Sequence, residues 1–235
     1  MRKLSGIGCG KWGKMLTKAR RQKPLLTPAH IKKRLAWAKA HADWTVDDWK
    51  AVVFSDKSKF NLVGSDGRQW CWGEPGQEPD PQYVTAWGCI TSSGLGRLVR
   101  IEGNMSAQLY IEILNDNLLG TFKDLGIKKK DVYFQQDNNP RHTARLTQDW
   151  LRTKKVDVLS WPPNSPDMNI IEHVWNYLDR RVRTGDPLHR NPAELWAALL
   201  EEWDGIEGDY VEELFESMPR RVQALLAAKG QRTLY

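Results

Sequence analysis

The sequence predicts a mixed α/β fold, in which one sheet is covered by helices. Strand-like runs are gathered between residues 51 and 101, helical and strand patterns alternate over 106–161, and only helical patterns follow. That order is typical of a sheet with helices packed on it. The chain has 235 residues, of which 40% are hydrophobic, so it is long enough to bury the core of one large domain. We expect that domain at 46–235, after a basic segment at 1–45.

The basic segment carries most of the positive charge. It contains 12 Lys and Arg and a single acid, Asp43, whereas the whole chain has a net charge of +6, so the remainder is acidic. A local excess of this size attracts polyanions through counterion release, and nucleic acid is the commonest such partner. A solvated basic tail is the alternative. The candidate DNA contacts in the runs KARRQK and KKR are Arg20, Arg21, Lys32, Lys33 and Arg34.

The first half of the chain indicates one helix followed by strands. Residues 1–26 show no period and form an irregular lead. Thr27 is placed to cap a helix that begins with Pro28 and runs to Ala42. The further expectations are an apolar strand at 51–54 that ends at Asp56, a hairpin over 59–72 that turns at 64–67, a Pro- and acid-rich loop at 74–82, and strands at 84–90 and 96–101 around the turn TSSG.

The second half alternates between helical and extended patterns. A helix follows Ser106, and Asp167 stands where a helix N-cap is expected. The other expectations are a strand at 132–136, a helix at 141–153, a strand at 156–161, a proline-rich loop at 161–166, a helix from Asp167 to about Arg183, and helices near 193–203, 209–217 and 220–228. The tryptophans fall mostly at stripe or strand positions, so we assign them to the core rather than to base stacking: Trp87, Trp150, Trp175 and Trp196.

Several classes of protein are disfavoured by composition. The three cysteines, Cys9, Cys71 and Cys89, are widely spaced without a C-x-x-C pair, so neither a disulfide framework nor a zinc site is expected, and a reducing compartment fits. No apolar run approaches the roughly 18 residues that a membrane span needs. We therefore expect a soluble protein without a membrane partner.

Three carboxylates stand at positions where α/β proteins place their sites. Asp56 and Asp137 follow strand-like runs, and ligands gather just beyond strand ends in such sheets. Glu172 lies on the flank of an apolar helical stripe, which comprises Ile171, Val174, Trp175, Leu178 and Val182. A carboxylate on that flank can reach the sheet edge while its helix stays packed. Taken singly, each strand-end acid is also an ordinary turn former.

Three converging carboxylates make a site of oxygen ligands alone. Such a site suits Mg²⁺ or Mn²⁺ rather than zinc, and the ions relieve the repulsion that otherwise raises carboxyl pKa values. Two divalent ions about 4 Å apart activate a water or hydroxyl and stabilise the leaving oxygen in phosphoryl transfer. The predicted chemistry is metal-dependent cleavage of a phosphodiester, with Asp56, Asp137 and Glu172 as metal ligands.

Three sequence blocks resemble the catalytic motifs of Tc/mariner-superfamily transposases, in the Tc-like branch. The blocks are FSDKSKF around Asp56, FQQDNNPRHTA around Asp137 and SPDMNIIEHVWNYL around Glu172, with 34 residues between the last two acids. The resemblance implies a ribonuclease H-like fold with these acids as the catalytic triad. It also implies that DNA is cut at transposon ends and that the freed 3′-hydroxyl attacks target DNA at a TA step, within a synaptic homodimer. The basic clusters permit import into the nucleus.

Two departures from the family pattern define the alternatives. Members of the family begin with paired helix-turn-helix units, and this sequence starts near the end of that region, so most of the DNA-binding part is expected to be missing. The stretch before the WGC strand is also shorter than in the family. A truncated or domesticated copy that binds DNA without sequence preference and does not catalyse transposition is therefore the main alternative, and a simpler ribonuclease H-like nuclease is a third.

The remaining candidates are basic residues near the triad and in the last helix. Arg141 and His142 are expected to contact the scissile phosphate or to orient the site, with an exposed helix start as the alternative. His173 points away from the apolar stripe and is expected at the surface. Arg220 and Arg221 are candidates for DNA backbone contacts, or form an ordinary solvated pair.

Overall fold

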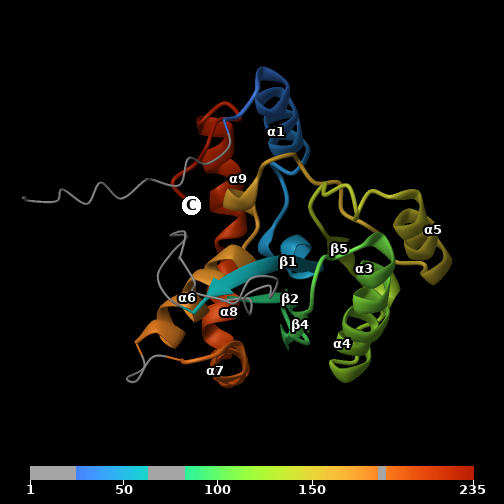
Figure 1. Ribbon diagram of the computed structural model, residues 1–235. Coiled ribbons are helices and arrows are strands. Elements are labelled where there is room, and N and C mark those ends of the chain that lie inside the picture. The colour runs from blue at the N-terminus through green and yellow to red at the C-terminus, as the bar shows by residue number, and fades with distance from the viewer. Residues whose placement is uncertain (1–24, 63–82, 185–188) are drawn as a thin grey trace, which may run out of the picture.

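The computed structural model describes residues 25–62, 83–184 and 189–235. Within them, a mixed sheet stands between two groups of helices (Figure 1). The strands follow the order β3-β2-β1-β5, and β4 also pairs with β2. Strand β1 pairs antiparallel with β2 and parallel with β5. The strands are β1 (Val52–Asn61), β2 (Tyr83–Thr91), β3 (Gly94–Leu95), β4 (Val99–Ile101) and β5 (Tyr133–Gln135).

Alternation along β1 divides the core into two clusters. Val52 and Phe54 join one cluster and Val53 the other, because successive side chains of a strand point to opposite faces. The first cluster is covered by α1 (Pro28–Ala40), α2 (Val46–Lys50), α6 (Ile171–Arg183), α7 (Pro192–Asp204), α8 (Gly208–Glu216) and α9 (Met218–Ala227). The second is covered by α3 (Ala107–Ile113), the π-helical segment η1 (Leu114–Leu118), α4 (Leu119–Asp124) and α5 (Arg145–Lys154).

The strand expected to end at Asp56 continues well beyond it. β1 extends to Asn61 because β2 pairs with it as far as the rung Asn61↔Tyr83. The parallel pairing with β5, however, ends at the rung Phe54↔Gln135. Asp56 therefore lies just beyond the last β1–β5 rung although it is in the middle of its own strand. The rest of the hairpin and the loop at 74–82 lie outside the described residues.

Two further elements differ from expectation. The helix expected from Arg141 begins only at Arg145, because the Thr147 hydroxyl donates to the carbonyl of Arg141 and the Gln148 amide to that of His142, which holds the preceding turn out of the helix. The strand expected at 156–161 is reduced to a single parallel bridge between Phe134 and Val158. A 3₁₀ turn, η3 (Pro166–Met168), precedes α6.

Helix α1 packs into the same core as the helices that follow the sheet. Trp37 and Ala38 of α1 are buried there, and α1 lies against α9 (Figure 1). The chain after α9 passes so close to α1 that a Cβ on Gly230, which has a φ of +82°, would lie 2.3 Å from the carbonyl oxygen of Ile31. The boundary predicted at 45/46 stays a prediction. None of the described helices is long and apolar enough to cross a membrane.

Of the tryptophans assigned to the core, Trp87 and Trp175 are buried. Trp150 and Trp196 are partly buried and pack against the two clusters. These positions agree with the core assignment. The only cysteine among the described residues, Cys89, is a free buried thiol, and Cys9 and Cys71 lie outside those residues.

Candidate active site

Asp56 occupies the point where β1 and β5 separate. Beyond the last parallel rung, the backbone of Ser55 is met by side chains instead of by a strand. Its N–H donates to Gln135 Oε1 (3.1 Å) and its carbonyl accepts from Asn169 Nδ2 (3.2 Å). The half-buried carboxyl of Asp56 emerges here, with Oδ1 accepting from the N–H of Lys57 at 2.7 Å. The sheet thus opens at the first acid.

Asp137 follows β5 and is held by a histidine. Its Oδ1 lies 2.6 Å from Nδ1 of His142 and accepts from the N–H of Asn139 at 3.0 Å. The His142 ring is 6% exposed and stacks on the buried ring of Tyr110, with 4.0 Å between centroids and 25° between planes. Tyr110 in turn donates its hydroxyl to Gln136 Oε1 (2.8 Å). The imidazole of His142 is therefore held by ring stacking on Tyr110, beside the carboxylate of Asp137.

Glu172 projects from the first turn of α6, as its position on the flank of the apolar stripe predicts. All five residues of that stripe are buried against the core, whereas Glu172 is half-buried and lines a cavity. The first turn of α6 has no side-chain cap. Asp167, expected to cap this helix, instead accepts two hydrogen bonds from Arg34, at 2.8 and 2.5 Å. The correction has a simple cause: Asp167 lies in η3, one turn before α6 begins.

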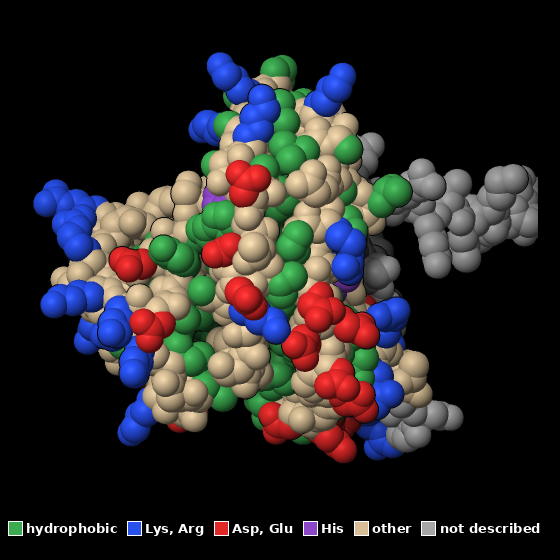
Figure 2. Space-filling model, turned by 180° about the vertical axis from the view of Figure 1, so that it is seen from behind, with side chains coloured by type: hydrophobic (Ala, Val, Ile, Leu, Met, Phe, Trp, Pro, Cys, Tyr) green, Lys and Arg blue, Asp and Glu red, His purple; other side chains and the backbone are tan. Residues whose placement is uncertain are grey.

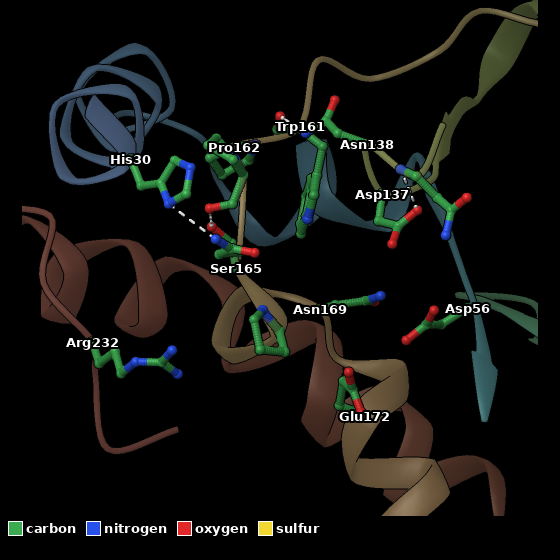
Figure 3. A pocket seen from close by; sticks show the side chains of 14 residues that line it. His30, Asp56, Asp137, Asn138, Trp161, Pro162, Ser165, Asn169, Glu172 and Arg232 are labelled. Carbon is green, nitrogen blue, oxygen red and sulfur yellow. Dashed lines mark hydrogen bonds between the residues drawn. The ribbon is translucent and has the colours of Figure 1, made fainter. Parts of the chain in front are cut away.

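The three acids line one cavity of about 620 Å³. Figure 3 shows Asp56, Asp137 and Glu172 directed at a common space, with Asn169 between them. The wall on the other side is formed by the loop at 161–166, and the far end is formed by His30 and Arg232. The cavity is therefore acidic at one end and carries basic side chains at the other. Sequence reasoning placed Asp56, Asp137 and Glu172 together, and their carboxylates do face a shared space.

The pKa values of Asp56 and Asp137 are shifted in opposite directions by their surroundings. Burial, and then the charge of Glu172, raise the pKa of Asp56 well above its usual value. Partial burial acts to raise the pKa of Asp137 too, but the hydrogen bond and charge of His142 outweigh it and lower that pKa below its usual value. The Asp56 carboxyl therefore holds its proton more tightly beside Glu172, whereas Asp137 is stabilised as a carboxylate.

The residues around this space fit a hard divalent cation in their chemistry. All three carboxyl groups are oxygen donors, and a cation would relieve the repulsion between Asp56 and Glu172. Among the residues that the structure describes, no three His, Cys, Asp or Glu side chains are closed into a metal-ligating cluster. The three carboxylates face the same end of the cavity without closing onto a single point, and Asp137 is in short contact with His142.

Comparison with known proteins decides the family. Residues 51–194 match the family model of the DDE superfamily endonucleases. The chain is 38% identical over 225 residues to the transposable element Tcb1 transposase of Caenorhabditis briggsae, which covers 91% of this chain and 81% of that protein. It is 36% identical over 226 residues to the transposable element Tc1 transposase of Caenorhabditis elegans, with the same coverage. The chain belongs to the Tc1/mariner family of DDE transposases.

Solved structures agree on the fold of this transposase domain. A Mos1 transposase paired-end complex with the left transposon end has a TM-score of 0.73 at 17% identity and covers 99% of this chain and 68% of that one. The catalytic domain of Mos1 mariner transposase has a TM-score of 0.70 at 17% identity, covering 88% and 97%. The predicted ribonuclease H-like sheet flanked by helices is confirmed, as is the predicted family.

The basic residues expected to contact DNA fall into two groups. Lys32 and Lys33 on α1 and Arg220 on α9 are exposed. Arg34 is fully buried, and Arg221 is 2% exposed, so the DNA contacts expected of these two are at odds with the structure. Arg20 and Arg21 lie outside the described residues.

The two buried arginines hold the turn before α6. Arg34 pairs with both carboxylate oxygens of Asp167 and also donates to the carbonyls of Gly230 and Gln231. Arg221 donates to the carbonyl of Asp167 at 3.1 Å. Charges this deeply buried are retained only with partners of this kind. Helix α1, the turn η3 and the tail after α9 are therefore joined through Arg34.

The prediction for His142 agrees with the structure, whereas the prediction for His173 does not. His142 orients the site, which is one of its two expected roles, while Arg141 is exposed beside it. His173 was expected at the surface, which is wrong: it is half-buried, and its Nε2 accepts from Arg221 Nη2 at 2.9 Å. The angular position on α6 was right, but the Arg221 side chain from α9 reaches that side of the helix.

Sequence reasoning missed Asn169. It is 4% exposed, and it contacts the strand of Asp56 and the backbone of Glu172. The available signal was a polar residue inside the apolar stretch MNII, three residues before the third acid. An asparagine there is unfavourable for a buried turn unless its amide has partners.

Proposed function

We propose that this chain cuts DNA phosphodiesters at transposon ends and joins the freed 3′-hydroxyl to target DNA, with Asp56, Asp137 and Glu172 as its catalytic acids. The observation that carries the proposal is the meeting of three carboxylates at one cavity wall, from a strand, a post-strand turn and a helix. Burying like-charged carboxyl groups close together is costly, so such a cluster is typical of a functional site. Membership of the DDE transposase family supports the same reaction class.

Each acid has a separate task in this proposal. Asp56 and Glu172, which are both acidic, would share the cations. Asp137, whose pKa is lowered by His142, would complete the ligand set. Mg²⁺ or Mn²⁺, as a pair of ions, would supply an activated water or hydroxyl and stabilise the leaving oxygen. The buried loop residue Trp161 forms part of the opposite wall of the cavity. Mos1 structures containing Mg and Mn agree with divalent metal use.

The proposed substrate is double-stranded DNA, bound first at transposon ends and then at TA target sites. The exposed lysines of α1 and the basic side chains near α5 and η2 (Lys129–Asp131) offer phosphate contacts. Figure 2 shows Lys and Arg gathered at the top and left of the molecule and acids gathered at the lower right, over α7 and α8. A synaptic homodimer is part of the proposal, because the two transposon ends must be held together. A nuclear location is also part of it, because the proposed target is genomic DNA.

Plasmid nicking tests the proposal directly. Supercoiled plasmid is incubated with protein in Mg²⁺, Mn²⁺ or EDTA, and relaxed product is measured. Wild type is compared with Asp137→Ala and with Asp204→Asn, which alters an exposed acid on α7. We expect metal-dependent nicking by wild type and Asp204→Asn and its loss in Asp137→Ala. Equal nicking by wild type and Asp137→Ala would refute the catalytic proposal.

A DNA-binding protein without catalysis is the second candidate. The observation that favours it is that the carboxylates, among the described residues, are not closed into a metal-ligating cluster. Gel shifts with transposon-end and scrambled duplexes over a salt series separate the candidates when combined with the nicking assay. Binding of both duplexes with equal salt dependence and no metal-dependent nicking would establish this second function.

A further inference from the structure

Asn169 connects the strand that carries Asp56 to the helix that carries Glu172. Its Nδ2 donates to the carbonyl of Ser55, the residue before Asp56, at 3.2 Å. Its own carbonyl accepts a hydrogen bond from the backbone N–H of Glu172, also at 3.2 Å. A single residue therefore joins β1 beside the first acid to the first turn of the helix that carries the third.

The strand needs this bond because the sheet opens there. The last parallel rung between β1 and β5 is Phe54↔Gln135, so β5 offers no backbone N–H to the carbonyl of Ser55. A buried carbonyl without a donor is costly. Asn169 supplies the donor, while Gln135 Oε1 accepts from the N–H of the same residue. Side-chain amides thus replace the missing strand at the point where Asp56 emerges.

The orientation of the Asn169 amide follows from its partner. The carbonyl of Ser55 only accepts, so Nδ2 faces it and Oδ1 faces away. Oδ1 is buried and has no hydrogen-bond partner among the described residues, although Asn169 lines the cavity of the three acids. Figure 3 shows its side chain extending between Asp137, Asp56 and Glu172. The one hydrogen bond that this side chain makes within the described part of the chain is therefore the bond to Ser55, and it is made at the wall of the cavity that the three acids line.

We propose that Asn169 is a positioning residue that fixes the separation between the carboxyl groups of Asp56 and Glu172, so that both remain able to hold the same cations. This inference rests on the proposed function. When both carboxyl groups are ionised, their like charges repel each other, and the Asn169 bridge opposes a separation of the two elements through Ser55 on one side and the Glu172 backbone on the other. Both of its bonds are to backbone atoms, so it acts on the acids through β1 and through the first turn of α6.

The test compares Asn169→Ala with Asn117→Ala. Asn117 in η1 makes the same kind of bond, from Nδ2 to the carbonyl of Ile113 at 3.2 Å, on the other face of the sheet. Mn²⁺ binding is measured by electron paramagnetic resonance, and nicking is measured with Mg²⁺. We expect Asn169→Ala to weaken Mn²⁺ binding and slow nicking by about 10- to 100-fold, the usual effect of removing a group that orients a metal ligand. Asn117→Ala should match wild type in both measurements.

Wild-type Mn²⁺ affinity and nicking in Asn169→Ala would overturn the inference. Asn169→Asp is the second variant, because it keeps the side chain's shape but cannot donate to Ser55. We expect it to nick as slowly as Asn169→Ala while it keeps wild-type DNA affinity in gel shifts, and wild-type nicking by Asn169→Asp would also overturn the inference. If Asn169→Ala unfolds below the assay temperature, Asn169→Asp decides.

The same measurements separate this inference from the proposed function. If wild type binds Mn²⁺ but does not nick DNA, the proposed function fails, and the Mn²⁺ affinity of Asn169→Ala alone decides the role of Asn169. If wild type binds no Mn²⁺, both fail. If wild type nicks and Asn169→Ala nicks equally, only the inference about Asn169 fails.

Discussion

Nδ1 of His142 lies 2.6 Å from Oδ1 of Asp137, and the imidazole is fixed from behind by the ring of Tyr110. A short contact of this kind holds the carboxylate in one orientation and supports its negative charge. The histidine itself is almost fully buried, so it acts on Asp137 from within the fold. The second acid is thus pre-oriented by a group that belongs to the core.

His142→Ala should reduce metal-dependent nicking by about 10- to 100-fold, because the carboxylate of Asp137 loses its orienting partner. Tyr110→Phe keeps the stacked ring and removes only the bond to Gln136, so its effect should be smaller. His189→Ala is the control: that ring contacts the carbonyl of Val182, at the end of α6. Nicking rates in Mg²⁺ are measured for each variant. An unchanged rate in His142→Ala would show that catalysis does not depend on the contact between His142 and Asp137.

Arg34→Met should lower the free energy of unfolding by about 3–5 kcal/mol, the usual cost of removing one partner of a buried ion pair. Asp167 would be left nearly buried without its cation, since the two side chains are 0% and 7% exposed. Urea denaturation measures the change. Lys50→Met removes the exposed pair with Glu212 and should have little effect. The double variant Arg34→Met/Asp167→Leu should recover part of the loss, because it leaves no unpaired charge.

The fold was predictable because most of its signals are local. Alternation along β1, the apolar stripe of α6 and the order of strands and helices depend on neighbours in the sequence. The three acids were also predictable, since strand ends and a helix flank bring them to one edge. The end of β1 was not, because Asn61 is kept extended by pairing with Tyr83, a partner that the local pattern at residues 51–61 does not contain.

The errors in the site have one physical origin, which is pairing over long sequence separations. Charge patterning placed Arg34 in a DNA-binding run, but its carboxylate partner lies 133 residues away. The prediction for His173 failed for the same reason, because its partner Arg221 lies 48 residues further along the chain. A helical wheel shows where a side chain points, but it does not show which element will be packed there. Sequence alone therefore overestimates the number of free basic residues.

Acid should destabilise the protein through Asp167. Burial acts to raise its pKa, but the bonds and charge of Arg34 and the contact with Thr233 lower it below the usual value. Folding is therefore favoured by ionisation above the unfolded pKa of about 4, and this contribution is lost as pH falls through the lower folded pKa. The difference in unfolding free energy between wild type and Asp167→Asn should be largest at pH 6–7 and shrink toward pH 3. A constant difference over this range would contradict the linkage.

His173 should remain neutral at pH values where an exposed histidine is charged. Burial, followed by the charges of Arg221 and Arg180, lowers its pKa to about 4. Guanidinium groups only donate, so Nε2 of His173 must be unprotonated to accept from Arg221. The unfolded chain then binds more protons, and stability should decline as pH falls from about 6.5 toward 4. An NMR titration measures the pKa directly, and Arg221→Gln should move it upward; a value near 6.5 in wild type would contradict the buried contact.

The burial of Arg34 leaves Lys32 and Lys33 as the residues of the KKR run that are able to reach DNA. Each is exposed on α1, and each phosphate contact releases counterions, so Lys→Gln at either position should weaken binding and reduce the slope of log K against log salt by about 1. The loss should be the same for transposon-end and scrambled duplexes, since phosphates carry no sequence information. Lys50→Gln, which alters the ion pair with Glu212 beside acidic α8, should leave the slope unchanged. Gel shifts from 50 to 200 mM salt measure it, and a slope that is unchanged in Lys32→Gln and Lys33→Gln would remove α1 from the DNA interface.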